Sequence, residues 1–272
     1  MQINGAVLFC DASGFTALTE KLAQRPGGAE RLRNIINKFF KILIDVVLNC
    51  GGDVIKFAGD AVLIVFPVHE GAGECPVDYS PDLKTAVMRA VQCQATAHEK
   101  CDHFVGFQSD TNPAETVELT THMGIGAGHL TAIHVGGVFG RYEYVMVGDP
   151  IEQIKIAEPL AASTETCISP EAYRLIEDEV PRGECPVVEG EHEKHLPEGR
   201  NKYRRITKLT TPLPEIYKVT LAPMAHSAGL LQRYGNFDIF FFGEHFPRIS
   251  QLTPPRTRPR TRRVLCSTWC PS

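Results

Sequence analysis

The sequence lacks any long apolar run. Its longest, AVLIVF at residues 61–66, is far shorter than the roughly 20 residues needed to cross a bilayer. The first residues, MQINGAVLFCDASGF, also lack the basic segment that opens a secretory signal peptide. We therefore expect no membrane span and a cytoplasmic location.

The sequence also lacks cysteines in paired, metal-binding spacing. Its nine cysteines are scattered along 272 residues, which is typical of reduced thiols in a reducing compartment. The hydrophobic content of 43% and charged content of 22% are ordinary for a globular protein, and the length allows one sizeable domain or two small ones.

The C-terminal part differs in composition from the rest. Residues 223–272 hold seven arginines and two acidic residues, in a chain whose net charge is −4. The segment 225–272 has no sustained periodicity and ends in a Pro/Arg-rich run, so we expect a solvated, disordered tail. A patch for nucleic acid or anionic lipid is the alternative for this tail, but no nucleic-acid partner is expected for the chain.

Residues 1–178 alternate between strand-length and helix-length apolar patterns. Helices are expected at 30–48, 82–104, 150–162 and 169–178, and strands at 6–10, 53–58, 61–66, 118–126, 129–135, 142–147 and 166–168. This βαββαβ order predicts an α+β, ferredoxin-like domain whose helices cover one face of an antiparallel sheet. Residues 179–224 are interpreted as an extension or linker.

Two aspartates stand where apolar runs break into tight turns. Asp11 follows a buried strand in FCDASGFT, and Asp60 occupies the turn of a hairpin in GGDVIKFAGDAVLIVF. Two carboxylates suffice as the protein's share of a Mg²⁺ site, since Mg²⁺ prefers hard oxygen ligands and completes its shell with phosphates and water. The turn after Asp11 leads into a helix, where backbone N–H groups favour phosphate.

Each aspartate taken alone is more often a turn or capping residue. A dehalogenase-type phosphatase is a rival interpretation, but Ser13 stands where that motif needs a second Asp. A diguanylate cyclase is suggested by Gly51-Gly52-Asp53, but Val54-Ile55 follow in place of Glu-Phe. The run 124–128, GIGAG, is a weak dinucleotide-loop match and more typical of a strand bend.

Four segments together resemble class III nucleotide cyclase catalytic domains, and most closely the first cyclase half of the soluble, bicarbonate-responsive adenylyl cyclases. They are FCDASGFTALTEKL, GGDVIKFAGDAVLIVF, THMGIGAGHL and YVMVGDPIEQIKIAEPLA, within about residues 5–178. The resemblance implies that Asp11 and Asp60, with the carbonyl of Ala12, hold two Mg²⁺ ions, for which Mn²⁺ can substitute. It further implies that Ser13, Gly14, Phe15 and Thr16 cradle the β- and γ-phosphates, with Gly59 allowing close backbone approach.

The sequence departs from the family at two positions. In homodimeric relatives an Asn and an Arg hold the ribose and the transition-state phosphate, and here Glu152 and Ile156 stand in their places. An aliphatic side chain cannot donate a hydrogen bond to that phosphate, and losing such a donor typically costs about 10²–10³ in rate. The chain is therefore expected to be a metal-holding half that needs a complementary cyclase domain, in trans or in a full-length protein.

Two lysines are assigned by the same resemblance to a second, degenerate pocket that binds bicarbonate. Lys56 lies on the strand before Asp60, and Lys155 matches the position of a partnering Arg. Since Lys keeps the charge but lacks the planar fork of Arg, weaker bicarbonate sensing is expected. The alternative is that both lysines pair with surface carboxylates. His122, His129 and His134 are expected to be exposed or hydrogen-bonded and not catalytic.

The sequence thus predicts an adenylate cyclase catalytic half that converts ATP to 3′,5′-cyclic AMP and pyrophosphate with two Mg²⁺ ions, in intracellular cyclic AMP signalling. The alternative is a catalytically silent regulatory or truncated module that binds nucleotide or bicarbonate without turnover. A metal-dependent phosphatase is a third, weaker interpretation.

Overall fold

The structure is a computed structural model that describes residues 2–68, 80, 82–109, 116–136, 142–181, 183–188 and 202–213. The tail expected at 225–272 lies outside the described residues. None of the helices in the described part of the chain is both long and apolar enough to cross a membrane.

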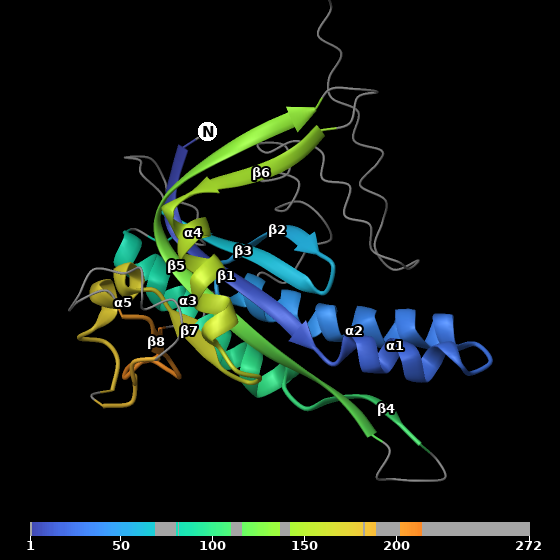
Figure 1. Ribbon diagram of the computed structural model, residues 1–272. Helices are drawn as coiled ribbons and strands as arrows, with labels where there is room; N and C mark the ends of the chain where they lie inside the picture. Colours follow the sequence, from blue (N-terminus) through green and yellow to red (C-terminus); the bar gives the residue numbers. More distant parts are fainter. Residues whose placement is uncertain are drawn as a thin grey trace, which may run out of the picture.

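An eight-stranded sheet forms the centre of the described chain (Figure 1). Its main path runs β2-β3-β1-β5-β7-β8, and β4 and β6 pair with β5. The strands are β1 (Gln2–Ser13), β2 (Asp53–Ala58), β3 (Ala61–Pro67), β4 (Phe104–Gln108), β5 (Thr116–Gly136), β6 (Tyr142–Gly148), β7 (Thr166–Ile168) and β8 (Arg204–Arg205). The predicted α+β class is confirmed, but the sheet is mixed, because β7 runs parallel to β5 while the other pairs are antiparallel.

Five helices pack on this sheet: α1 (Phe15–Ala23), α2 (Gly28–Asn49), α3 (Leu83–Cys101), α4 (Asp149–Leu160) and α5 (Pro170–Ile176). Asp82 caps α3, accepting a hydrogen bond from the backbone N–H of Thr85 at 2.7 Å, and Ser169 caps α5 in the same way. The sequence analysis expected a helix after the turn at Asp11 without giving its bounds, and it missed β4. It extended α3 to residue 104, whereas the helix ends at Cys101 and the chain then turns into β4.

The two faces of the sheet are covered differently. Along β1, Ala6, Leu8 and Cys10 join the main core with α2 and α3, whereas Val7 joins a second cluster with Ile154 of α4. Helix α4 therefore lies on the opposite face from α2 and α3, in front of the sheet in Figure 1. This differs from the expectation that helices cover one face only.

Strand β5 is continuous, although two strands, 118–126 and 129–135, with a bend in the run 124–128 were expected. The glycines within it serve packing, because a Cβ at Gly124 would lie 2.7 Å from the backbone N of Glu158 and one at Gly126 would lie 2.7 Å from the carbonyl of Pro150. Without side chains at these positions, α4 can approach the strand closely.

Residues after the predicted boundary at 178 also contribute to the core. Val180, Cys185, Ile206 and Leu209 are buried in the same cluster as the sheet residues, and the backbone N–H of Ile206 donates to the carbonyl of Thr166 at 2.9 Å. The division into 1–178 and 179–224 stays a prediction, but described residues on both sides of it share one core.

Candidate functional site

Asp11 lies near the end of β1, directly opposite His122 of β5. The neighbouring hairpin of β2 and β3 closes with the pair Ala58 and Ala61, so Gly59 and Asp60 form its two-residue turn. Gly59 has φ 72°, as the first central residue of a type II′ turn requires. Asp60 is exposed at the tip of this hairpin.

The charge environment of Asp11 links it to Asp60. Burial raises the pKa of the Asp11 carboxyl, and the negative charge of Asp60 raises it further. The nearby His122 and the backbone N–H of Ala12 act in the opposite direction on this pKa. Two carboxylates thus repel each other at a partly buried position, which a bound divalent cation would relieve.

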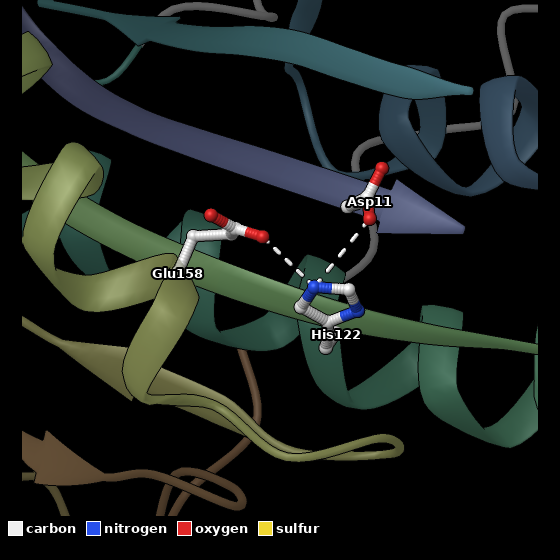
Figure 2. Close-up of side chains that lie close together, drawn as sticks. All are labelled: Asp11, His122 and Glu158. Atoms are coloured by element: carbon white, nitrogen blue, oxygen red, sulfur yellow. Dashed lines mark hydrogen bonds and ion pairs between the residues drawn. The ribbon is translucent and has the colours of Figure 1, made fainter. Parts of the chain in front are cut away.

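His122 connects Asp11 to α4. Its Nε2 lies 2.8 Å from Glu158 Oε1 and 3.4 Å from Asp11 Oδ2, while its Nδ1 lies 3.2 Å from the hydroxyl of Ser13 (Figure 2). The three ionisable side chains are only 18–26% exposed. Donor atoms of Asp11, His122 and Glu158 all lie within 4.8 Å of one another, a spacing at which they could also share a metal ion.

The predicted phosphate loop follows Asp11. Gly14 has φ 100° and is the N-cap of α1, and a Cβ there would lie 2.5 Å from the carbonyl of Glu118. Phe15 packs its ring on Phe39 and Phe40, whereas Thr16 is exposed. Because the first N–H groups of an α-helix have no partner within the helix, the start of α1 offers donors beside Asp11. Ala12 is buried and pairs with Thr121.

The two predicted bicarbonate lysines lie on different elements. Lys56 is exposed on β2 and pairs with Leu63, whose side chain contacts the cluster on the α4 face, so its register puts it on the face that carries Asp11. Lys155 on α4 is 2.6 Å from Glu152, and both side chains are more than 60% exposed. The described contacts of Lys155 therefore include the surface pair named as the alternative in the sequence analysis.

Ile156, at the position of the family's Arg, packs against a small cluster that contains Ala157, Ala161, Cys167 and Tyr203. One member of this cluster, Tyr203, belongs to the segment that follows α5.

A second group has the order of a catalytic triad. His98 Nε2 lies 2.8 Å from the hydroxyl of Thr166, and its Nδ1 lies 2.7 Å from Asp102 Oδ2. Asp102 Oδ1 also accepts from the N–H and the hydroxyl of Thr121. Thr166 is only 1% exposed, so this network joins α3, β5 and β7 and has no access to substrate.

Of the three histidines considered in the sequence, His129 and His134 are exposed and His122 is hydrogen-bonded, as expected. The sequence analysis did not place His122 beside Asp11, and it did not consider Glu158. A sequence pattern could have indicated both residues. His122, Gly124 and Gly126 alternate along β5 and so share one face of the strand, and Glu158 lies on the helix that packs against this face.

Comparisons with known proteins agree with this architecture. Adenylate cyclase type 10 of Mus musculus is 28% identical over 175 residues, which cover 63% of this chain and 10% of the relative. The chain thus spans about a tenth of the length of such curated relatives. No protein-family model matches it.

Solved cyclase domains share the fold. The adenylyl cyclase CyaB from P. aeruginosa has a TM-score of 0.58 at 23% identity, covering 79% of this chain and 98% of that structure. The dimeric guanylyl cyclase domain of the RhoGC fusion protein from Blastocladiella emersonii has a TM-score of 0.54 at 17% identity, covering 78% and 98%. The resemblance inferred from the four sequence segments is confirmed, because the chain is similar to adenylate cyclase type 10 and shares its fold with solved adenylyl and guanylyl cyclase domains.

Proposed function

We propose that this cyclase-like chain is one catalytic half of an adenylyl cyclase, which makes 3′,5′-cyclic AMP and pyrophosphate from ATP when joined to a complementary cyclase domain. The observation that carries the proposal is the pairing of β1 with β3 up to Cys10 and Val62, which brings Asp11 and the Gly59-Asp60 turn to the same end of the sheet, beside the start of α1. We propose ATP, and not GTP, as the substrate because the chain is similar to adenylate cyclase type 10. A cytoplasmic role in cyclic AMP signalling is proposed on the same ground.

The donor set fits Mg²⁺. Asp11 and Asp60 supply hard carboxylate oxygens. Burial and, after it, the charge of Asp60 raise the pKa of Asp11, and a divalent cation removes repulsion of this kind. In this proposal both aspartates hold the ions, with help from the Ala12 carbonyl. Bound Mg²⁺ would stabilise the charge that develops on the attacking, bridging and leaving oxygens.

The rest of the half-site binds the triphosphate. The backbone N–H groups of the turn from Ser13 to Thr16 are proposed to hold the β- and γ-phosphates, aided by the positive end of the α1 dipole. Gly14 and Gly59, both at positive φ, allow the backbone to turn tightly at the two edges of the site.

The two positions on α4 where the family carries transition-state donors hold Glu152 and Ile156 in this chain. Glu152 is exposed and paired with Lys155, and Ile156 is packed in an apolar cluster, so neither offers the donors expected at these positions. These donors are proposed to come from the partner domain. The same observation supports the second candidate, a catalytically silent module that binds nucleotide without turnover.

Bicarbonate is proposed as a weak effector. Lys56 lies on the face that carries Asp11, but Lys155 must leave Glu152 to bind an anion. An exposed ion pair of this kind is worth only about 0.3–0.5 kcal/mol, so the pairing would lower the affinity without abolishing it.

The test is reconstitution with a purified second-half domain of adenylate cyclase type 10. With ATP and Mg²⁺ the mixture should release cyclic AMP and pyrophosphate, while the isolated chain should be inactive. Asp60→Ala should abolish the activity, and Asp45→Ala, which removes an exposed aspartate of α2 paired only with Lys41 in the described contacts, should not.

Each other outcome has a distinct meaning. Turnover by the isolated chain at the reconstituted rate would refute the half-site argument. Activity that survives Asp60→Ala would refute the metal assignment. Binding of ATP with Mg²⁺ but no product in the mixture would favour the silent module, and release of inorganic phosphate would indicate a phosphatase.

A further inference from the structure

His122 lies against the proposed metal site without being part of the predicted ligand set. It is the direct cross-strand partner of Asp11, and such partners have Cβ atoms about 4.5–5.5 Å apart. A one-residue slip between β1 and β5 would move both side chains to the other face. The register of the two central strands therefore fixes this pair.

The imidazole ring is held from both sides. The Ser13 hydroxyl lies 3.2 Å from Nδ1, and Glu158 Oε1 lies 2.8 Å from Nε2. Since both carboxylates near Nε2 are acceptors, Nε2 carries the proton and donates to Glu158, with Asp11 Oδ2 at 3.4 Å on the same edge. A ring fixed at two nitrogens cannot rotate away from Asp11.

This arrangement places the two oxygens of Asp11 differently with respect to the ring. Figure 2 shows one carboxylate oxygen of Asp11 directed at His122 and the other directed away from the ring. The imidazole edge, 3.4 Å from one oxygen, restricts the rotation of the Asp11 carboxylate and keeps the other oxygen turned away from the ring. Neighbours of this kind around metal ligands typically change metal affinity by 10–100-fold.

Helix α4, which supplies Glu158, can approach the imidazole ring because β5 has a glycine, Gly124, beneath this residue. A Cβ at Gly124 would lie 2.7 Å from the Glu158 backbone N and 3.0 Å from its Cβ. The sequence thus combines a glycine on β5, a glutamate on α4 and a histidine between them to brace the aspartate.

We propose that His122, braced by Ser13 and Glu158, is a positioning residue that holds the Asp11 carboxylate ready for a divalent cation. This rests on the proposed function, because it takes Asp11 as a metal ligand. His122 acts through Asp11 and does not itself bind the ion.

The experiment measures binding of Mn²⁺ alone to the purified full chain by electron paramagnetic resonance, without nucleotide or partner domain. His122→Ala should weaken Mn²⁺ binding about 10-fold, and Glu158→Ala should weaken it in the same direction. His122→Gln, whose amide keeps a donor on the same edge, should recover part of the loss. The matched control is His129→Asn on the same strand, an exposed histidine hydrogen-bonded to Asn4, which should bind Mn²⁺ as the wild type does.

Thermal unfolding of each variant separates a loss of fold from a loss of positioning, and Glu158→Ala tests the proposal if His122→Ala does not fold. Wild-type affinity in folded His122→Ala and Glu158→Ala, with binding lost in Asp60→Ala, overturns the role of His122 and leaves the metal site standing. A ¹⁴N coupling in the Mn²⁺ spectrum that disappears in His122→Ala also overturns it, since the histidine would then be a ligand. Absence of Mn²⁺ binding by the wild type overturns the metal assignment itself.

Discussion

Replacing Asp53 by Asn should stabilise the folded chain at neutral pH. Asp53 opens β2 opposite the buried Val65, and burial raises the pKa of its carboxyl to about 6, although the N–H of Val54 partly offsets this. The folded pKa is above the unfolded value of 3.8, so the native state binds the proton more tightly. The stability from this group is fully present below pH 3.8 and is lost as the pH rises through about 6.

The magnitude follows from the shift. The difference between 3.8 and about 6 corresponds to about 3 kcal/mol at 1.36 kcal/mol per pH unit. Because the side chain is only partly buried by surface area, solvent reduces this figure, and we expect Asp53→Asn to raise the free energy of unfolding by about 1–2 kcal/mol at pH 7.5. Asn keeps an oxygen that can accept from Val54.

Urea unfolding of wild type and variant, compared at pH values from 4 to 7.5, measures the effect. The advantage of the variant should be small near pH 4, grow up to about pH 6 and be constant above pH 7. The control is Asp45→Asn, at an exposed position of α2, which should change the free energy of unfolding by less than about 0.5 kcal/mol at every pH. A variant that is less stable than the wild type at pH 7.5, or whose advantage does not depend on pH, would refute the reasoning.

Two further predictions concern the supports of the site. Gly124→Ala should destabilise the fold by about 1–3 kcal/mol in urea unfolding and weaken Mn²⁺ binding, since its Cβ pushes α4 away; unchanged stability would show that α4 can shift freely. Asp102→Asn should cost about 1.5–3 kcal/mol at pH 7, because hydrogen bonds from His98 and Thr121 lower the pKa of this carboxyl despite burial. A lowered pKa gives stability that is present above the unfolded value and lost as the pH falls through the folded one, so the cost should shrink in acid; a constant difference between pH 7 and pH 3 would contradict this.

The sequence predicted the elements that carry local signals. The amphipathic run at 30–48, the Gly59-Asp60 turn and the capped helix after Ser169 all lie where periodicity and turn chemistry put them. These features depend on residues close in sequence, which a pattern can reveal. The expectation that Asp11 and Asp60 belong to one site came from the family motifs and stays a prediction.

What the sequence did not reveal depends on contacts between distant segments. The pairing of Asp11 with His122 requires the register of β1 and β5, and the reach of Glu158 requires α4 to pack on Gly124. The glycines of β5 indicated a bend when considered locally, and the structure adds the close approach of α4 at Gly124 and Gly126. Helix α1 was expected after the turn at Asp11, but its bounds were not given, because its first residues were interpreted mainly as a phosphate loop.

The core shared by residues on both sides of position 178 has a consequence for synthesis. Asp11, Asp60, His122 and Glu158 have all been added to the growing chain before Ile206 and Leu209, which complete the main core. A nascent chain paused between these points holds every proposed site residue while part of its apolar interior is still open to solvent. The main core can therefore close only after the segment that forms β8 has left the ribosome, and until then apolar surface stays available to chaperones and proteases.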